Sequence, residues 1–330
     1  MIAHSKPTVG EAEGAAVARV VASGNLAQGT EVAAFEEACA SFLGRRYAIA
    51  VNSGTAALHL ALVGLNVRPE DSVAIPSYAC ASLAQAVSWQ HAHPILCDID
   101  SQSNLDPAMV PDSARAVVVP HMFGATATLP EHLRVVEDLA QSFGGDTGRG
   151  TIVSMTSFYA TKLMTTGEGG MIFTDDSSLA EFMRDRRDYD NRSDFQIRYA
   201  YKMTDFQAAL GRVQLSRLPE FLARRRAIAA RYHDALHDSP LVLPAPGGAV
   251  YFRYVVSTPE GPALMEWLNE RGIGAGRPVH HPAHHTLGGI FPRSEQAHQH
   301  HVSIPIYPAM SDAEVEVVVE SIEQFFEARS

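Results

Sequence analysis

The chain has 330 residues and a mass of 35.7 kDa, which is enough for one large α/β domain and a smaller one, and excludes a disulfide-stapled mini-protein. Hydrophobic residues make up 46% and charged residues 19% of the chain, so a full core is expected and disorder is excluded on composition. The net charge is −11 and the arginines are scattered rather than gathered in a stripe, which argues against nucleic-acid or anionic-membrane binding and favours small ligands.

The three cysteines, Cys39, Cys80 and Cys97, form no CxxC pair and no repeated spacing. An odd number without such a pattern fits a reducing compartment, so we expect a cytoplasmic protein. The first ten residues lack a basic region followed by an apolar stretch, and no run approaches the roughly 18 apolar residues of a spanning helix. We therefore expect neither export nor membrane insertion.

Helical and strand-like patterns alternate over the first two thirds of the chain. In residues 31–44 the apolar side chains recur mostly at three- and four-residue steps, which predicts an amphipathic helix that ends at Gly44. Further helices are expected at 54–65 and 79–90, and short apolar strands at 47–51, 72–75, 94–97, 116–119, 135–137 and 152–158. This order predicts a mostly parallel sheet flanked by helices.

The last third of the chain has a different pattern. A helical stretch from Thr204 to about Leu236, interrupted at Pro219, leads into a break rich in proline and glycine at 239–248. A strand at 251–256 and helices at 262–271 and 312–326 follow. We therefore divide the chain into a large domain, 1–238, and a smaller C-terminal domain, 239–330.

A first candidate site is Ser53-Gly54-Thr55, which follows a predicted strand and opens a helix. The free N–H groups and the dipole of a helix N-terminus favour a phosphate, and glycine permits its close approach. The same residues are also typical of an ordinary helix cap.

A second candidate site is the acidic pair Glu137-Asp138 with Gln141, at the end of a predicted strand. A carboxylate in this place can keep an aromatic nitrogen base protonated, and Gln141 can donate a hydrogen bond to a nearby oxygen. The alternative is a solvated turn.

A third candidate site runs from Ser157 to Lys162, before a glycine-rich segment. Among 26 basic residues only Lys6, Lys162 and Lys202 are lysines. An amine, unlike a guanidinium, can lose its proton and attack a carbonyl, so Lys162 is a candidate for Schiff-base chemistry. The alternative is a lysine on an exposed loop. A phosphate seat, a pyridinium partner and a Schiff-base lysine are together the groups that a pyridoxal phosphate site needs.

The chain resembles the DegT/DnrJ/StrS family of sugar aminotransferases over nearly its whole length. Asp138-x-x-Gln141 is followed 21 residues later by Lys162. The other matching segments are Gln28-Gly29, Phe35-Glu36, Ser53 to Leu58, Pro76-Ser77, Asp98 to Asp100, His121 to Gly124, Thr166 to Gly170, Met203 to Ala209 and Ile304 to Pro308. The resemblance implies the fold-type-I pyridoxal phosphate architecture, α/β, with a mostly parallel sheet of the seven-stranded type in the large domain and a smaller C-terminal α+β domain.

The resemblance also implies roles for the candidate residues. Lys162 is expected to bond pyridoxal 5′-phosphate as a Schiff base and then to move the substrate proton as a general acid and base. Asp138 is expected to hold the pyridine nitrogen protonated, and Gln141 to lie near the phenolic oxygen. The phosphate is expected to contact Gly54, Thr55 and Ser157.

The chain departs from the family pattern at two cofactor positions. Cys80 stands where the family usually has an aromatic residue stacked on the cofactor ring, so Cys80 or Tyr78 is expected there. Ala200 replaces an asparagine that reaches the phosphate of the neighbouring subunit, and Lys202 is the candidate replacement. The short segment between His121 and Glu137 leaves little room for the helix that the family carries there.

Seven histidines crowd the segments 280–285 and 298–301. Zinc and nickel bind imidazoles, but neither an HExxH helix nor a cysteine partner accompanies these, so we expect no metal site. The resemblance brings the segment to the active-site mouth and makes His280 and His281 candidate substrate contacts.

We interpret the sequence as a homodimeric pyridoxal-phosphate-dependent aminotransferase. The resemblance implies glutamate or glutamine as amino donor and a keto-sugar, often nucleotide-linked, as acceptor in amino-sugar biosynthesis. Two alternatives stay open: an acceptor that is a cyclitol or another small ketone, and a non-catalytic regulatory protein that binds the cofactor. Lys162, Asp138 and Gln141 together argue against the second, because a pure binder needs neither an electron sink nor a proton shuttle.

Overall fold

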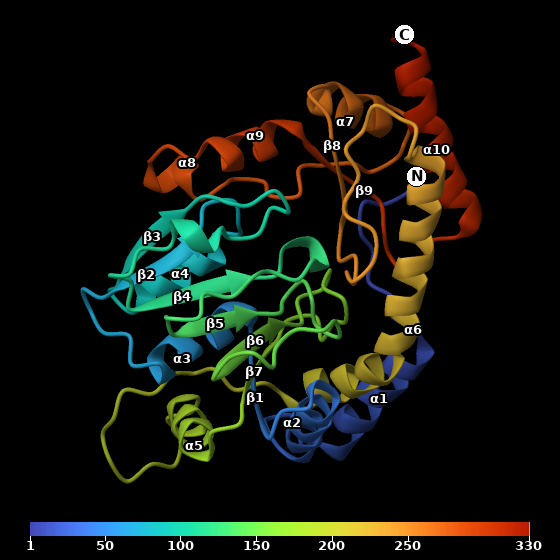
Figure 1. Ribbon diagram of the computed structural model, residues 1–330. Helices are drawn as coiled ribbons and strands as arrows, with labels where there is room; N and C mark the ends of the chain where they lie inside the picture. The colour runs from blue at the N-terminus through green and yellow to red at the C-terminus, as the bar shows by residue number, and fades with distance from the viewer. Residues whose placement is uncertain (330) are drawn as a thin grey trace.

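A computed structural model describes residues 1–329, which form a seven-stranded sheet covered by helices on both faces, with a second, smaller unit beside it (Figure 1). The strand order is β1-β7-β6-β5-β4-β2-β3, and only β7 runs antiparallel to its neighbours. The strands are β1 (Tyr47–Val51), β2 (Ser72–Pro76), β3 (His93–Cys97), β4 (Ala116–Pro120), β5 (Val135–Asp138), β6 (Val153–Ser157) and β7 (Gly170–Thr174). The prediction of a mostly parallel sheet is confirmed.

Both faces of the sheet are buried, which explains why its strands are apolar throughout rather than alternating. In β1, Ile49 and Val51 pack into one core with α3 (Gly54–Gly64), α4 (Ser82–Trp89) and α5 (Ser177–Arg186). Ala48 and Ala50 pack into the opposite core with α2 (Thr30–Leu43) and the first half of α6 (Asp205–Leu236). The helix predicted from residue 31 does end at Gly44, whose φ of 74° favours glycine.

Helix α6 joins the large unit to the small one. It runs through Pro219 without a break, so the predicted interruption there is wrong. Proline removes one backbone donor, but Leu215, Leu218 and Phe221 on either side of it are buried in or against the cores and hold the helix together. Its last turns, from Ile228 to Leu236, pack into the core of the small unit.

The small unit is a two-stranded antiparallel sheet with helices around it. It consists of β8 (Tyr254–Ser257), α7 (Gly261–Glu270), α8 (His284–Leu287), α9 (Pro292–His300), β9 (His301–Ile304) and α10 (Asp312–Glu327). The N-terminal segment before α1 (Glu11–Ser23) also joins it, because Ile2 exchanges backbone hydrogen bonds with Gly272 and Gly274, both 2.8 Å. No helix among residues 1–329 is long and apolar enough to cross a membrane.

The connection from β4 to β5 is short, as its sequence predicts. Within it the structure has only a 3-10 turn, Met122–Gly124, in place of an α-helix. The turn therefore lies directly at the carboxyl end of the sheet, beside Asp138.

Candidate active site

The carboxyl ends of β4, β5 and β6 and the N-terminus of α3 enclose a cavity of about 360 Å³. Parallel strands bring their carboxyl ends to one edge of a sheet, which is where α/β sheets bind ligands. The cavity wall contains seven of the predicted site residues: Gly54, Thr55, Cys80, Asp138, Gln141, Ser157 and Lys162. The structure thus brings all three candidate segments into one site.

The N-terminus of α3 forms the seat for a phosphate. Ser53 caps the helix by accepting a hydrogen bond from the N–H of Ala56 at 3.1 Å. The N–H groups of Gly54 and Thr55 have no hydrogen-bond partner among residues 1–329, and both residues line the cavity. A Cβ on Gly54 would lie 2.6 Å from the Cβ of Ser157, so only glycine permits this approach. The cap and the phosphate seat are therefore compatible at this helix end.

Asp138 is almost fully buried at the end of β5. Its Oδ1 accepts a hydrogen bond from the N–H of Ala140 at 2.8 Å, whereas Oδ2 has no hydrogen-bond partner among residues 1–329. Burial raises the pKa of Asp138, and the Ala140 amide and the charge of Lys162 oppose that rise. The free carboxylate oxygen faces the cavity, where it can pair with a protonated ring nitrogen. Because Asp138 is buried at the end of a strand, the alternative of a solvated turn is wrong.

The Lys162 side chain reaches into the same cavity, and its amine has no hydrogen-bond partner in the described part of the chain. Its Nζ lies 5.1 Å from the centre of the Phe252 ring. Burial lowers the pKa of the Lys162 amine, while the nearby Asp138 and Cys80 oppose this effect. Burial therefore favours the neutral, nucleophilic amine.

Hydrogen bonds hold the chain together at the carboxyl ends of β4 and β5, beside the cavity. Glu137 is buried and accepts hydrogen bonds from Nε2 of His121 (3.0 Å) and from the N–H of Gly148 (2.6 Å). Gln141 accepts one from the N–H of Phe123 at 2.8 Å, which leaves its Nε2 with only the sulfur of Met122 at 3.8 Å. The Gln141 amide is thus oriented with spare donor capacity beside the cavity.

These groups fit pyridoxal 5′-phosphate. Two free N–H groups and the Ser157 hydroxyl suit its phosphate, the free Oδ2 of Asp138 suits its ring nitrogen, and the Lys162 amine suits its aldehyde. Cys80 lines the wall where an aromatic residue was the family expectation. Tyr78 does not replace it, because its ring is fully buried against Phe123 and His301.

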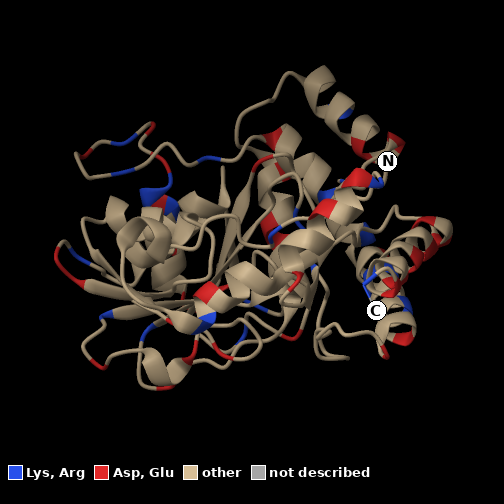
Figure 2. Ribbon diagram, turned by 90° about the horizontal axis from the view of Figure 1, so that it is seen from above, with Lys and Arg blue, Asp and Glu red and all other residues tan. Residues whose placement is uncertain are grey.

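Three other predicted residues lie elsewhere in the structure. Lys202 is outside the cavity of its own chain and forms ion pairs with Asp188 (3.1 Å) and Asp190. These residues belong to the loop after α5, where Figure 2 shows acidic and basic residues interspersed.

His280 and His281 are exposed, stack edge-on against each other and line neither this cavity nor the larger one described below. The neighbouring His284 and His285 both contact Glu295, at 3.2 and 2.7 Å. In the described structure it is His301, rather than His280 or His281, that faces the larger cavity.

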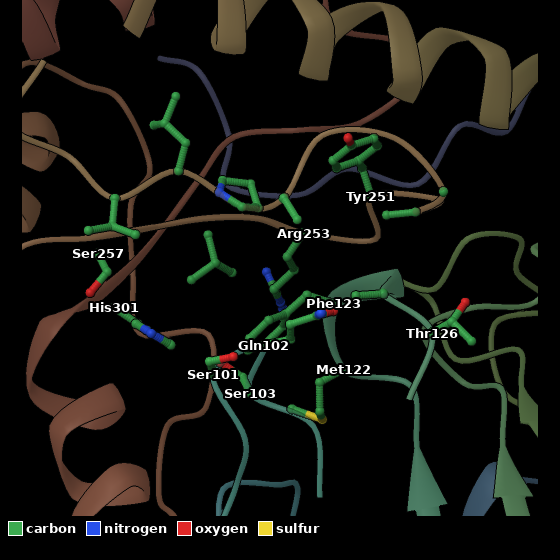
Figure 3. A pocket seen from close by; sticks show the side chains of 18 of the residues that line it. Ser101, Gln102, Ser103, Met122, Phe123, Thr126, Tyr251, Arg253, Ser257 and His301 are labelled. Carbon is green, nitrogen blue, oxygen red and sulfur yellow. The ribbon is translucent and has the colours of Figure 1, made fainter. Parts of the chain in front are cut away.

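A second, larger cavity of about 480 Å³ adjoins the site, and Met122 lines both. Figure 3 shows Arg253 reaching into it toward Phe123, with Ser101, Gln102 and Ser103 close by. Sequence reasoning missed Arg253 and Phe252. The one feature of the sequence that could have pointed to Arg253 is its position as a single arginine within the predicted apolar strand 251–256.

Comparison with known proteins agrees with this geometry. Residues 7–323 match the family described as DegT/DnrJ/EryC1/StrS aminotransferases. The spore coat polysaccharide biosynthesis protein SpsC of Bacillus subtilis (strain 168) is 33% identical over 374 aligned positions, which cover 97% of this chain and 95% of that protein.

Two solved structures are similarly close. The aminotransferase TlmJ from Streptoalloteichus hindustanus is 30% identical, with a TM-score of 0.90 over 99% of each chain. DesV from S. venezuelae is 29% identical, with a TM-score of 0.90 over 95% of this chain and 94% of that one.

Proposed function

The chain belongs to the DegT/DnrJ/EryC1/StrS aminotransferase family, and from that premise we propose that it transfers an amino group from glutamate or glutamine to a keto-sugar. It is an aminotransferase that depends on pyridoxal phosphate. One observation carries the assignment to this site: the Lys162 amine and the Asp138 carboxylate line one cavity, and neither forms a salt bridge within residues 1–329.

Each residue of the cavity has a part in the reaction. The cofactor, when bound, supplies an electron sink for the carbon that bears the amino group. The N–H groups of Gly54 and Thr55 and the Ser157 hydroxyl would bind the phosphate, and Asp138 would hold the ring nitrogen in its protonated form. Lys162 would hold the aldehyde carbon, and its amine would move a proton between the substrate carbon and the cofactor carbon.

The keto-sugar acceptor is supported by the relatives. SpsC is named for the biosynthesis of a spore coat polysaccharide, and its match covers nearly all of this chain. The cavity beside the site offers the hydroxyl and amide groups of Ser101, Gln102, Ser103 and Thr126, which suit the hydroxyls of a sugar. We propose a nucleotide-linked keto-sugar as the acceptor.

We also propose a cytoplasmic homodimer. The loop between α5 and α6 carries apolar side chains with little cover: Phe195 is 97% exposed and Ile197 70%. Such a surface is unfavourable in water and suits a second copy of the chain. Lys202 belongs to the same loop. In such a dimer the Lys202 amine is a candidate to bind the cofactor phosphate of the neighbouring subunit. The three cysteines are all unpaired, which supports a reducing compartment.

Isotope transfer tests the proposal. Purified holoenzyme is incubated with glutamate or glutamine, each labelled with 15N at the α-amino group, and a panel of nucleotide-linked keto-sugars, with a cyclitol ketone alongside. We expect mass spectrometry to find label in an amino-sugar with the natural chain and with Lys6→Ala, an exposed-lysine control, but not with Lys162→Ala. Label in the cyclitol alone would move the acceptor to that class, and label in no ketone would contradict the proposed function.

A further inference from the structure

The larger cavity contains one charged side chain without an ionic partner. Of all the residues lining the cavity, Arg253 alone has a full charge at neutral pH, because burial and the charge of His300 lower the pKa of His301 to about 4. Within residues 1–329 no carboxylate forms a salt bridge with Arg253. Burial lowers the pKa of Arg253, and no acidic group opposes that effect. Among the described residues no carboxylate therefore neutralises this partly buried cation.

The guanidinium of Arg253 also has unused donors. Its Nη1 lies 3.0 Å from Nε2 of His4, whose ring is neutral because burial and the charge of Arg253 lower the His4 pKa to about 4. Nε and Nη2 of Arg253 have no hydrogen-bond partner among the described residues, yet they are not closed off from solvent. These two atoms form the planar fork that a carboxylate matches with two parallel hydrogen bonds.

Arg253 and the reactive lysine lie against the same aromatic ring. Lys162 Nζ is 5.1 Å and the Arg253 guanidinium carbon 5.2 Å from the centre of the Phe252 ring. Besides burial, the charge of Arg253 also lowers the pKa of the Lys162 amine, so the two groups lie near each other. An amino-acid donor needs both, because its amine must reach the carbon held by Lys162 while its carboxylate requires a cation.

We propose that Arg253 binds a carboxylate of the amino-acid donor and so positions the donor amine beside Lys162. The proposal rests on the proposed function, since it assigns the donor of that same site. In this role Arg253 is a specificity-determining residue: it selects amines that carry a carboxylate. A second source of the same chemistry is a keto-sugar that bears a carboxylate, and the experiment separates the two.

The first arm measures binding without turnover. Isothermal titration of the holoenzyme with 2-oxoglutarate compares the natural chain with Arg253→Gln, Arg253→Lys and the control Arg226→Gln, an exposed arginine. A hydrogen-bonded charge pair corresponds to a loss in affinity of roughly 10- to 100-fold, so we expect Kd to rise by that factor in Arg253→Gln. Arg253→Lys should recover part of the affinity, and Arg226→Gln should leave it unchanged.

The second arm measures amino loading with two donors. We expect Arg253→Gln to raise KM for glutamate with a smaller change in kcat, and to load from 2-aminopropane, which has no carboxylate, as the natural chain does. Unchanged Kd and KM would overturn the proposal, and so would an equal loss with 2-aminopropane. If Arg253→Gln raised KM only for a keto-sugar that bears a carboxylate, in the second half-reaction, Arg253 would bind the acceptor. That result would also overturn the proposal. If the natural chain loads from no donor, the proposed function fails, and the titration still decides the role of Arg253.

Discussion

His121 donates a hydrogen bond of 3.0 Å to Glu137, and this buried pair joins β4 to β5 directly behind the active-site cavity. The N–H of Ala127 donates to Nδ1 of His121 at 2.9 Å, so the proton of the neutral ring lies on Nε2 and points to the carboxylate. His121 precedes Met122, and Glu137 precedes Asp138, both of which line the cavity. The pair therefore fixes two walls of the site without entering it.

We expect Glu137→Gln to destabilise the protein by about 2 kcal/mol at pH 7, because it removes a buried hydrogen-bonded charge. Burial raises the Glu137 pKa, but the hydrogen bonds from His121 and Gly148 outweigh this, so the folded-state pKa lies below its ordinary value of 4.5. The carboxylate thus stabilises the fold above pH 4.5, and this contribution is lost as the pH falls through the folded-state pKa.

Urea unfolding of Glu137→Gln and of the natural chain between pH 7 and pH 4 tests this account. The exposed Glu131→Gln is the control. The stability difference should narrow below pH 4.5, and a difference that stays constant across the range would contradict the role of the charge.

Asp138→Asn should leave the fold and cofactor binding in place but slow amino loading by about 100- to 1,000-fold, a typical cost of removing one electrostatic group from an active site. An amide cannot supply the negative charge that keeps a ring nitrogen protonated. Stopped-flow absorbance with glutamate measures the rate, with the exposed Asp146→Asn as control. A rate within threefold of the natural chain would show that Asp138 does not act on the ring.

Gly54→Ala should weaken pyridoxal phosphate binding by about tenfold or more, because the added Cβ displaces the phosphate seat. That Cβ would lie 2.6 Å from Cβ of Ser157, whereas a Cβ on Gly14 would meet nothing within 4 Å. Fluorescence titration of apoprotein with the cofactor compares the two alanine variants. Equal cofactor affinity in the two variants would show that the N-terminus of α3 does not bind the phosphate.

Asp205 holds the start of α2 from a distance of more than 170 residues along the chain. Its carboxylate accepts hydrogen bonds from the N–H groups of Gly29 (2.7 Å), Val32 (3.0 Å) and Glu31 (3.3 Å). We expect Asp205→Ala to cost about 2 kcal/mol of stability, as does the loss of a strong helix cap, and Asp205→Asn to cost less. Equal stability of all three chains in urea unfolding would refute the capping role.

The sequence predicts the sheet well where the strands are buried on both faces. Residues 116–120 of β4 read Ala-Val-Val-Val-Pro, and such a run is typical of the centre of a parallel sheet. Strand β7 and helix α5 were not expected. β7 begins at Gly170 inside a glycine-rich segment, and the pairing of that glycine with Val51 and Ser157 is a tertiary contact that no local pattern reveals.

The site residues, too, could be predicted only where a local sequence pattern places them. Gly54 and Lys162 each follow a strand and Asp138 ends one, so the topology of the sheet brings them together. Lys202 and His280 lie on loops, where the side-chain direction depends on contacts such as that of Lys202 with Asp188. Arg253 belongs to a mostly apolar segment, and only the packing of the small unit against the sheet shows that its guanidinium enters a cavity.

Spectroscopy of the donor half-reaction tests the central claim, that Lys162 is the reactive amine of an aminotransferase. Purified protein with pyridoxal phosphate should show a band near roughly 410 to 430 nm that moves to about 330 nm when glutamate or glutamine is added. Lys162→Ala should lack the band of the lysine-bound cofactor and should not turn the donor over, while Lys6→Ala should behave as the natural chain. A natural chain whose band never shifts with any amino donor, or a Lys162→Ala variant that shifts as fast as the natural chain, would contradict the account.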